Sequence, residues 1–183
     1  MSAASHPTHP TRLALIEAGL ELAVDTSLSR LTIDAIVNKA GVAKGTFYVH
    51  FADRAAFLVA LHERFHEWLR DLVFQAIDGL PPGAERLRIG TATYLNDCLQ
   101  EKAIKAILLE ARCETAITMQ VQRRNSEFAK LIEADFRALD WPEPATSASL
   151  FVILGAEAAL IELETGRNEA LRQTLWRFAR IEE

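Results

Sequence analysis

Two histidines one helical turn apart are the residues whose type and spacing most directly suggest chemistry. His62, Glu63 and His66 match the pattern H-E-x-x-H. On a helix, both histidines of this pattern lie on one face and can bind Zn²⁺, and the glutamate can act as a general base. A catalytic zinc ion also needs a third ligand and an open position, and no downstream ligand stands out. We therefore expect two half-buried histidines, no catalytic residue and no metal. A metal-responsive site at His62 and His66, or a zinc hydrolase, is the alternative.

Helical periodicity dominates the chain around these histidines, and neither an alternating strand pattern nor an internal repeat is present. The stretch 78–83 contains two glycines and two prolines and is the clearest linker. Predicted helices cover residues 11–25, 32–40, 43–49, 53–77, 84–100, 102–113, 115–139, 145–164 and 168–182. The sequence therefore predicts an all-α fold.

Composition and charge limit the classes of function. The chain has 183 residues, of which 50% are hydrophobic and 25% charged, as in a soluble globular protein. A net charge of −5 and a pI near 5.6 argue against a general nucleic-acid binder. Residues 1–57, however, carry equal numbers of basic and acidic side chains, so the negative charge lies in the rest of the chain. The front of the chain is therefore the part that can approach a polyanion.

Cysteine content and hydropathy indicate a cytoplasmic protein that does not enter a membrane. The two cysteines, Cys98 and Cys113, are too few for a disulfide framework. The N-terminal residues lack the apolar run of a signal peptide. The apolar stretch 150–163 contains Glu157 and Glu162 and is shorter than the roughly 20 residues that a transmembrane helix needs.

The segment 32–51 has the layout of a helix-turn-helix. Thr32 is a good N-cap for a first short helix, and Gly41 permits a sharp reversal before a second helix begins. In DNA-binding proteins with this layout, the second helix enters the major groove. The side chains expected to pack inside the angle are Ile36, Val37, Val42 and Phe47.

The segment 31–58, LTIDAIVNKAGVAKGTFYVHFADRAAFL, resembles the N-terminal domain of the TetR/AcrR family of transcriptional regulators. The residues that carry this resemblance are Gly41-Val42, Lys44-Gly45-Thr46-Phe47-Tyr48, His50-Phe51 and Asp53-Arg54. The match covers about residues 11–60, and beyond it only the helical architecture is similar. Residues 1–11 are expected to form a flexible arm. The resemblance implies a helix-turn-helix domain over 12–57 and a helical effector-binding and dimerisation domain over 58–183.

The expected DNA contacts follow from side-chain chemistry. Thr32 at a helix start can offer its hydroxyl and backbone N–H groups to a phosphate, and Lys44 can reach phosphate or a guanine edge. In the family, the tyrosine at the position of Tyr48 typically touches phosphate. The candidates are Thr32, Val42, Ala43, Lys44, Gly45, Thr46, Tyr48, His50 and Arg54. Few of these are long and polar, so DNA shape is expected to contribute to specificity.

The last two predicted helices fit a dimer interface. The run 150–156 is apolar nearly all round, and a helix of that kind must be buried. Members of the family usually dimerise through these two helices, and an internal core helix in a monomer is the alternative. The candidates are Leu150, Ile153, Leu154, Ala158, Ile161, Leu171, Leu175 and Phe178.

A pocket for a small, partly apolar organic effector is implied by the resemblance and not by any motif. Ordinary core packing is the competing interpretation for each lining candidate. These candidates are Phe65, Trp68, Leu69, Tyr94, Cys98, Ile107, Met119 and Phe128, with Glu110, Arg112 and Glu114 as possible polar groups.

The resulting expectation is a homodimeric regulator, not an enzyme, that binds an inverted-repeat operator in double-stranded DNA and needs no cofactor. The resemblance implies a repressor that a small molecule releases by moving the helix that begins at Asp53. Activation, and a helical dimer without operator binding, are the alternatives.

Overall fold

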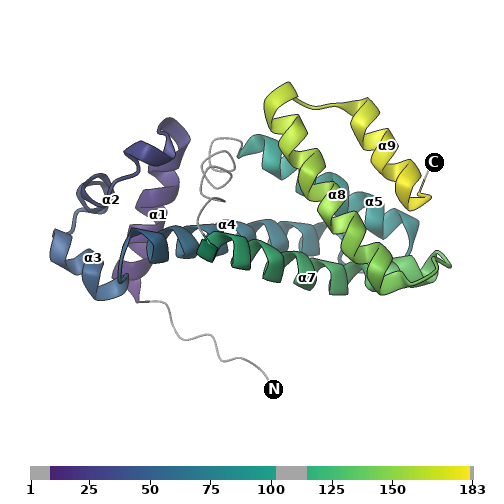
Figure 1. The fold of residues 1–183 in the computed structure, drawn as a ribbon, viewed down its shortest axis with the longest axis horizontal. Coiled ribbons are helices and arrows are strands. Elements are labelled where there is room, and N and C mark those ends of the chain that lie inside the picture. Colours follow the sequence, from purple (N-terminus) through teal and green to yellow (C-terminus); the bar gives the residue numbers. More distant parts are fainter. Residues whose placement is uncertain (1–8, 102–114, 182–183) are drawn as a thin grey trace, which may run out of the picture. The chain divides into compact units, whose positions relative to one another are not determined.

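The computed structural model describes residues 9–101 and 115–181 (Figure 1). The regular structure in these residues is helical, and they contain no strand. This confirms the all-α prediction. The expected helix over 102–113 lies outside the described residues, together with Ile107, Glu110, Arg112, Cys113 and Glu114. The helices are α1 (Pro10–Asp25), α2 (Ile33–Ala40), α3 (Lys44–His50), α4 (Arg54–Ala76), α5 (Ala84–Gln100), α7 (Thr115–Ala138), α8 (Pro144–Thr165) and α9 (Glu169–Ala179).

Local capping explains several of the helix ends. The expected cap at Asp53 is confirmed, because its Oδ1 accepts a hydrogen bond from the N–H of Ala56 at 2.8 Å. The last helix was expected to reach residue 182 but ends at Ala179, so that boundary was wrong. Arg180 adopts a left-handed conformation, and the N–H of Ile181 donates to the helix at 3.1 Å, which closes it.

Within the described ranges the chain divides into two compact units. The first contains residues 9–65 with 115–118, and the second contains residues 66–101 with 119–181. The division falls inside α4, eight residues beyond the boundary that the sequence suggested after residue 57.

The first unit packs α1, α2 and α3 against the start of α4. Leu15, Ile36, Phe47 and Phe57 are completely buried in its core. Gly19 allows α1 to approach α4 closely, because a Cβ at this position would lie 2.6 Å from Cζ of Phe57. This small core supports the α2–turn–α3 segment.

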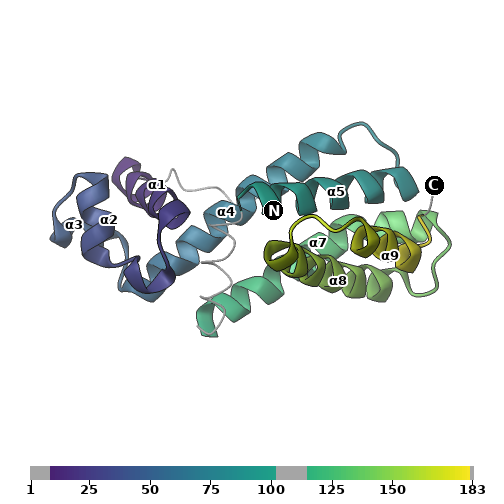
Figure 2. The same cartoon turned by 90° about the horizontal axis from the view of Figure 1, so that it is seen from above.

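In the second unit, α8 lies against α5 and α9 (Figure 2). One face of α8 is buried, including Phe151, Gly155 and Ala159. Helix α8 has 22 residues, and an 18-residue window within it has a mean hydropathy of 1.6. It is longer than the apolar stretch considered above and could cross a membrane by length and composition alone. Core helices of soluble proteins meet the same criteria, so this is weak evidence for a membrane span.

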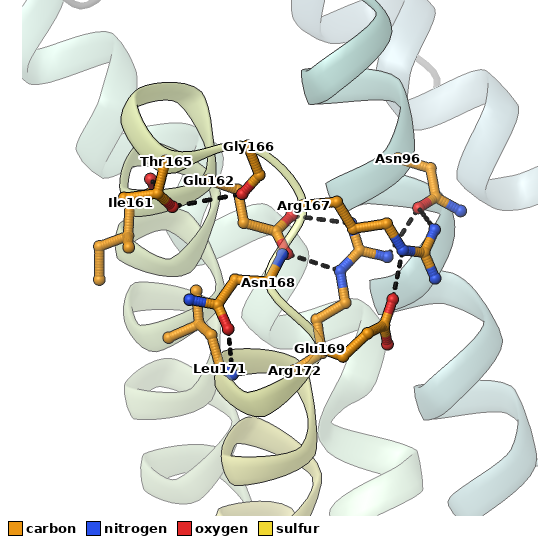
Figure 3. A network of polar contacts seen from close by, with 10 residues as sticks. All are labelled: Asn96, Ile161, Glu162, Thr165, Gly166, Arg167, Asn168, Glu169, Leu171 and Arg172. Atoms are coloured by element: carbon orange, nitrogen blue, oxygen red, sulfur yellow. Dashed lines mark hydrogen bonds and ion pairs between the residues drawn. The ribbon is translucent and has the colours of Figure 1, made fainter.

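A buried ion pair joins α8 to α9 in the second unit (Figure 3). Both carboxylate oxygens of Glu162 accept hydrogen bonds from the guanidinium of Arg172, each at 2.7 Å. Arg172 also donates to Oδ1 of Asn96 on α5 at 2.7 Å, and the N–H of Asn168 donates to Glu162 at 3.0 Å. The pair therefore ties the α8–α9 connection to a third helix.

Candidate nucleic-acid interface

Backbone hydrogen bonds around one glycine close the turn between α2 and α3. Gly41 has φ +68° and ψ +30°, a left-handed conformation that glycine adopts without steric cost. The N–H of Val42 donates to the carbonyl of Val37 at 3.0 Å and so satisfies the end of α2. At the other end, Oγ1 of Thr32 accepts from the N–H of Ala35 at 3.2 Å. Both predicted caps of this helix are confirmed.

Phe47 fixes the orientation of α3. Its completely buried ring lies 5.3 Å from the ring of Phe51 and 5.5 Å from that of Phe57. The guanidinium of Arg12 on α1 lies 5.0 Å from the centre of the Phe51 ring, which is a cation–π distance. The prediction that Phe47 packs inside the helix-turn-helix is confirmed, and Phe51 is buried beside it. Because these rings pack one face of α3 into the core, the helix has a fixed orientation and its other face is a rigid surface.

The exposed face of α3 contains Lys44, Gly45, Tyr48 and Val49. Tyr48 is 51% exposed and Val49 79%. Gly45, Tyr48 and Val49 are three and four residues apart and therefore share a face. Val49 was not among the sequence-derived candidates, although its spacing from Gly45 would have indicated it.

Lys44 begins this face and forms an ion pair in the free protein. Its Nζ lies 2.8 Å from Oδ1 of Asp34 on α2. The hydrogen bond and the charge of Asp34 raise the pKa of Lys44, so its ammonium stays charged at neutral pH. Both side chains are exposed, so the pair contributes little to stability and Lys44 stays accessible to solvent.

The remaining DNA-contact candidates differ in exposure. His50 at the end of α3 is half-buried, and its ring lies 4.9 Å from the ring of His9. His9 caps α1 by accepting from the N–H of Thr11 at 3.2 Å, so residues 10 and 11 of the expected arm belong to α1. Residues 1–8 lie outside the described range. Ala43 and Thr32 are exposed, and Val42 and Thr46 are half-buried.

Arg54 has a structural role that sequence reasoning did not find. Its Nε donates to the carbonyl of Leu31 at 3.0 Å, and its Nη2 donates to the carbonyl of Leu28 at 2.6 Å. These bonds fasten the connection between α1 and α2 to the start of α4. The guanidinium is half-buried in this arrangement. A phosphate contact of Arg54 stays a prediction and would use its remaining N–H groups.

The H-E-x-x-H histidines are buried rather than half-buried. Nε2 of His66 lies 2.5 Å from Nη1 of Arg124 on α7. An arginine side chain can only donate, so Nε2 must accept and its lone pair is directed at a cation. Among the described residues, no three His, Cys, Asp or Glu side chains gather in a group that could hold a metal ion. This geometry does not favour metal binding at His66 Nε2.

The effector-pocket candidates fall in several environments. A cavity of about 70 Å³ lies in the second unit among α4, α5, α7 and α8, and Tyr94 and Phe128 line it. Phe65, Leu69 and Cys98 are buried away from this lining, Trp68 is half-buried and Met119 is exposed. Sequence reasoning missed the polar residues Arg86, Arg124, Asn125 and Asp135 in the lining, because they come from helices far apart in the chain.

The dimer candidates divide into exposed and buried groups. Leu150, Ile153, Leu154 and Ile161 are exposed on α8, and Phe178 is exposed on α9. We call these five residues the α8–α9 apolar face. Ala158 and Leu175 are buried inside the unit, and Leu171 is half-buried. The exposed group is the part of the prediction that is accessible to a partner.

Comparison with known proteins gives the family of the N-terminal segment and the fold of the chain. Residues 15–61 match the family model described as bacterial regulatory proteins, tetR family. A TetR-family transcriptional regulator from Rhodococcus sp. is similar in fold, with 17% identity, a TM-score of 0.77 and coverage of 94% of this chain and 98% of that one. The multidrug binding protein EbrR, complexed with imidazole, has 19% identity, a TM-score of 0.76 and coverage of 93% and 95%. The regulatory protein TetR from Rhodobacter sphaeroides has 24% identity, a TM-score of 0.68 and coverage of 94% and 99%. The sequence match assigns residues 15–61 to the TetR family of bacterial regulatory proteins, and the chain along its length has the fold of these solved structures.

Proposed function

We propose that the protein is a cytoplasmic, homodimeric repressor that reads an inverted-repeat operator with α3. The observation that carries this proposal is the exposed face of α3, held rigid by the buried ring of Phe47. In the proposed complex, Tyr48 and Lys44 contact phosphates, Thr32 adds a contact from the start of α2, and Gly45 permits close approach of the groove.

A dimer is proposed because one headpiece carries too few basic groups for tight binding. The α8–α9 apolar face contains residues 150, 153, 154 and 161, whose spacing places them along one side of α8. Burying this face against a second copy removes the apolar side chains from water. Two headpieces then read half-sites about one helical turn of DNA apart, roughly 34 Å.

We propose that a small organic molecule bound in the second unit regulates this dimer. The support is a mostly apolar cavity in that unit, and the structural similarity to a protein named for multidrug binding. A ligand releases DNA only if it binds one headpiece arrangement better than the other, since coupling requires differential affinity. Helix α4 contributes to both units and is the element proposed to carry the change.

The first experiment selects genomic DNA fragments that the purified protein binds, and the recovered sequence is then used in fluorescence anisotropy. We expect one short inverted repeat. Lys44→Ala and Tyr48→Phe should each weaken operator binding. Lys44→Ala should also reduce the salt dependence of the affinity, because binding with one phosphate contact fewer releases fewer counterions. Lys130→Ala on the exposed surface of α7 removes the same charge and is the matched control. Unchanged affinity in both α3 variants would contradict the assigned contacts, and a monomer in light scattering would contradict the dimer.

A further inference from the structure

The interior of the second unit contains a glycine that faces empty space. Gly155 on α8 is buried, yet a Cβ built on it would meet no atom within 4 Å. By contrast, a Cβ on Gly90 of α5 would lie 3.2 Å from Cγ2 of Ile77. Gly90 is therefore explained by close packing, and Gly155 is not. Both glycines line the 70 Å³ cavity, and the space beside Gly155 belongs to it.

The size of the cavity limits what it can hold. A single water needs about 10–15 Å³ of such space, so about 70 Å³ has room for roughly five waters or a compact organic group of about one ring. The side chains of Val73, Leu87, Phe128 and Phe151 make much of the wall apolar. Waters need two to four polar partners each, so this wall favours an apolar occupant.

At one end of the cavity, the charges of Arg86 and Asp135 neutralise each other. Asp135 is buried and accepts two hydrogen bonds from the guanidinium of Arg86, at 2.7 and 2.8 Å. Its Oδ1 also accepts from the N–H of Gly83 at 2.9 Å. This bidentate pair satisfies both charges internally, so it gives a charged ligand no unpaired counterion.

The other polar end offers a hydrogen-bond donor. Arg124 donates to Oδ1 of Asn125 at 3.0 Å. This bond fixes the orientation of the Asn125 amide, since its oxygen is the atom that faces the guanidinium. Nδ2 of Asn125 then carries two N–H groups, and no residue in the described ranges accepts from them. Arg124 and Asp135 are about three turns apart on α7, so this donor lies away from the neutralised pair.

We propose that the cavity beside Gly155 binds a compact, mainly apolar molecule of about one ring that carries one hydrogen-bond acceptor. The ring occupies the space beside Gly155, and the acceptor receives a hydrogen bond from Nδ2 of Asn125. This inference rests on the proposed function, because it names the class of molecule that the regulator senses.

The test uses two probes of similar size, acetophenone and ethylbenzene, and titration calorimetry on the full-length protein. Acetophenone has a carbonyl acceptor that ethylbenzene lacks. One net hydrogen bond corresponds to a preference of about 3- to 10-fold, so acetophenone should bind more tightly by that factor. Asn125→Leu should abolish the preference and retain ethylbenzene binding. Equal affinities in the wild-type protein would overturn the assigned acceptor.

Gly155→Leu should fill the space and abolish binding of both probes. Ala145→Leu adds the same side chain to an exposed position of the same helix and should bind like the wild type. Circular dichroism and light scattering check the fold of each variant. If Gly155→Leu does not fold, Gly155→Ala fills part of the same space and should weaken both probes. Wild-type affinity in a folded Gly155→Leu protein would overturn the location.

Operator binding, measured in parallel, separates this inference from the proposed function. If neither probe binds the wild type at millimolar concentration while operator binding is intact, the ligand class is wrong and the DNA-binding proposal stands. If the probes bind with the expected pattern but no operator is found, the site stands and the proposed function fails. If a bound probe leaves operator affinity unchanged, the sensing role is wrong.

Discussion

The buried pair between Glu162 and Arg172 allows a quantitative test of the second unit. Glu162 is completely buried and Arg172 is 2% exposed, so neither charge is compensated by water. Glu162→Gln preserves the shape of the side chain but removes its charge and replaces one acceptor oxygen with an NH₂ donor. Arg172 is then a buried cation without its carboxylate. Breaking a buried pair in this way costs about 3–5 kcal/mol of the free energy of unfolding.

An exposed pair in the same network is the matched control. Arg167 and Glu169 form an ion pair at the surface, where water competes with the interaction. Glu169→Gln makes the same chemical change and should cost less than about 1 kcal/mol. The measurement is urea unfolding followed by circular dichroism at one fixed protein concentration, because the stability of a dimer depends on concentration. Equal losses in Glu162→Gln and Glu169→Gln would refute the reasoning from burial.

The pH dependence of stability tests the same pair independently. Burial disfavours the charged form of Glu162, but the hydrogen bonds from Arg172 and Asn168 and the charges of Arg172 and Arg167 outweigh it and lower the pKa of Glu162. Because the folded pKa lies below the ordinary value of 4.5, the contribution is present above 4.5 and is lost as the pH falls through the lowered pKa. Unfolding curves of the wild type should show this loss, and those of Glu162→Gln should lack it.

Three further substitutions test other parts of the molecule. Gly45→Ala should stabilise the protein by about 0.5–1 kcal/mol in thermal unfolding, since the added Cβ meets no atom within 4 Å. The same variant should weaken operator binding in anisotropy if the DNA groove approaches α3 closely. Gly19→Ala should destabilise by about 1–3 kcal/mol in urea unfolding, because its Cβ would overlap the ring of Phe57; a stabilised variant would contradict the close packing of α1 and α4. Burial, helped by the charge of Glu101, raises the pKa of Asp97, so Asp97→Asn should stabilise the protein at pH 7. The wild-type protein should become more stable as the pH falls through the raised pKa, and the variant should lack this gain.

Much of the helical structure could be predicted from the sequence because it depends on neighbouring residues. The capping hydroxyl of Thr32, the left-handed Gly41 and the carboxylate of Asp53 each act within a few residues of their own position. The order of residue types from Gly41 to Phe51 likewise indicated the helix-turn-helix. The caps are local features that spacing revealed, whereas the helix-turn-helix was indicated by its layout together with its resemblance to the TetR/AcrR family.

Other features were decided by tertiary structure because their partners are distant in the chain. Arg54 binds carbonyls more than 20 positions earlier, and His66 meets Arg124 across 58 positions. Periodicity shows that a helix has an apolar face but does not show what covers it. The sequence by itself thus determined the helices and the motif on α3, whereas packing decided which side chains surround the cavity and which remain exposed on α8, because both depend on how distant helices approach each other.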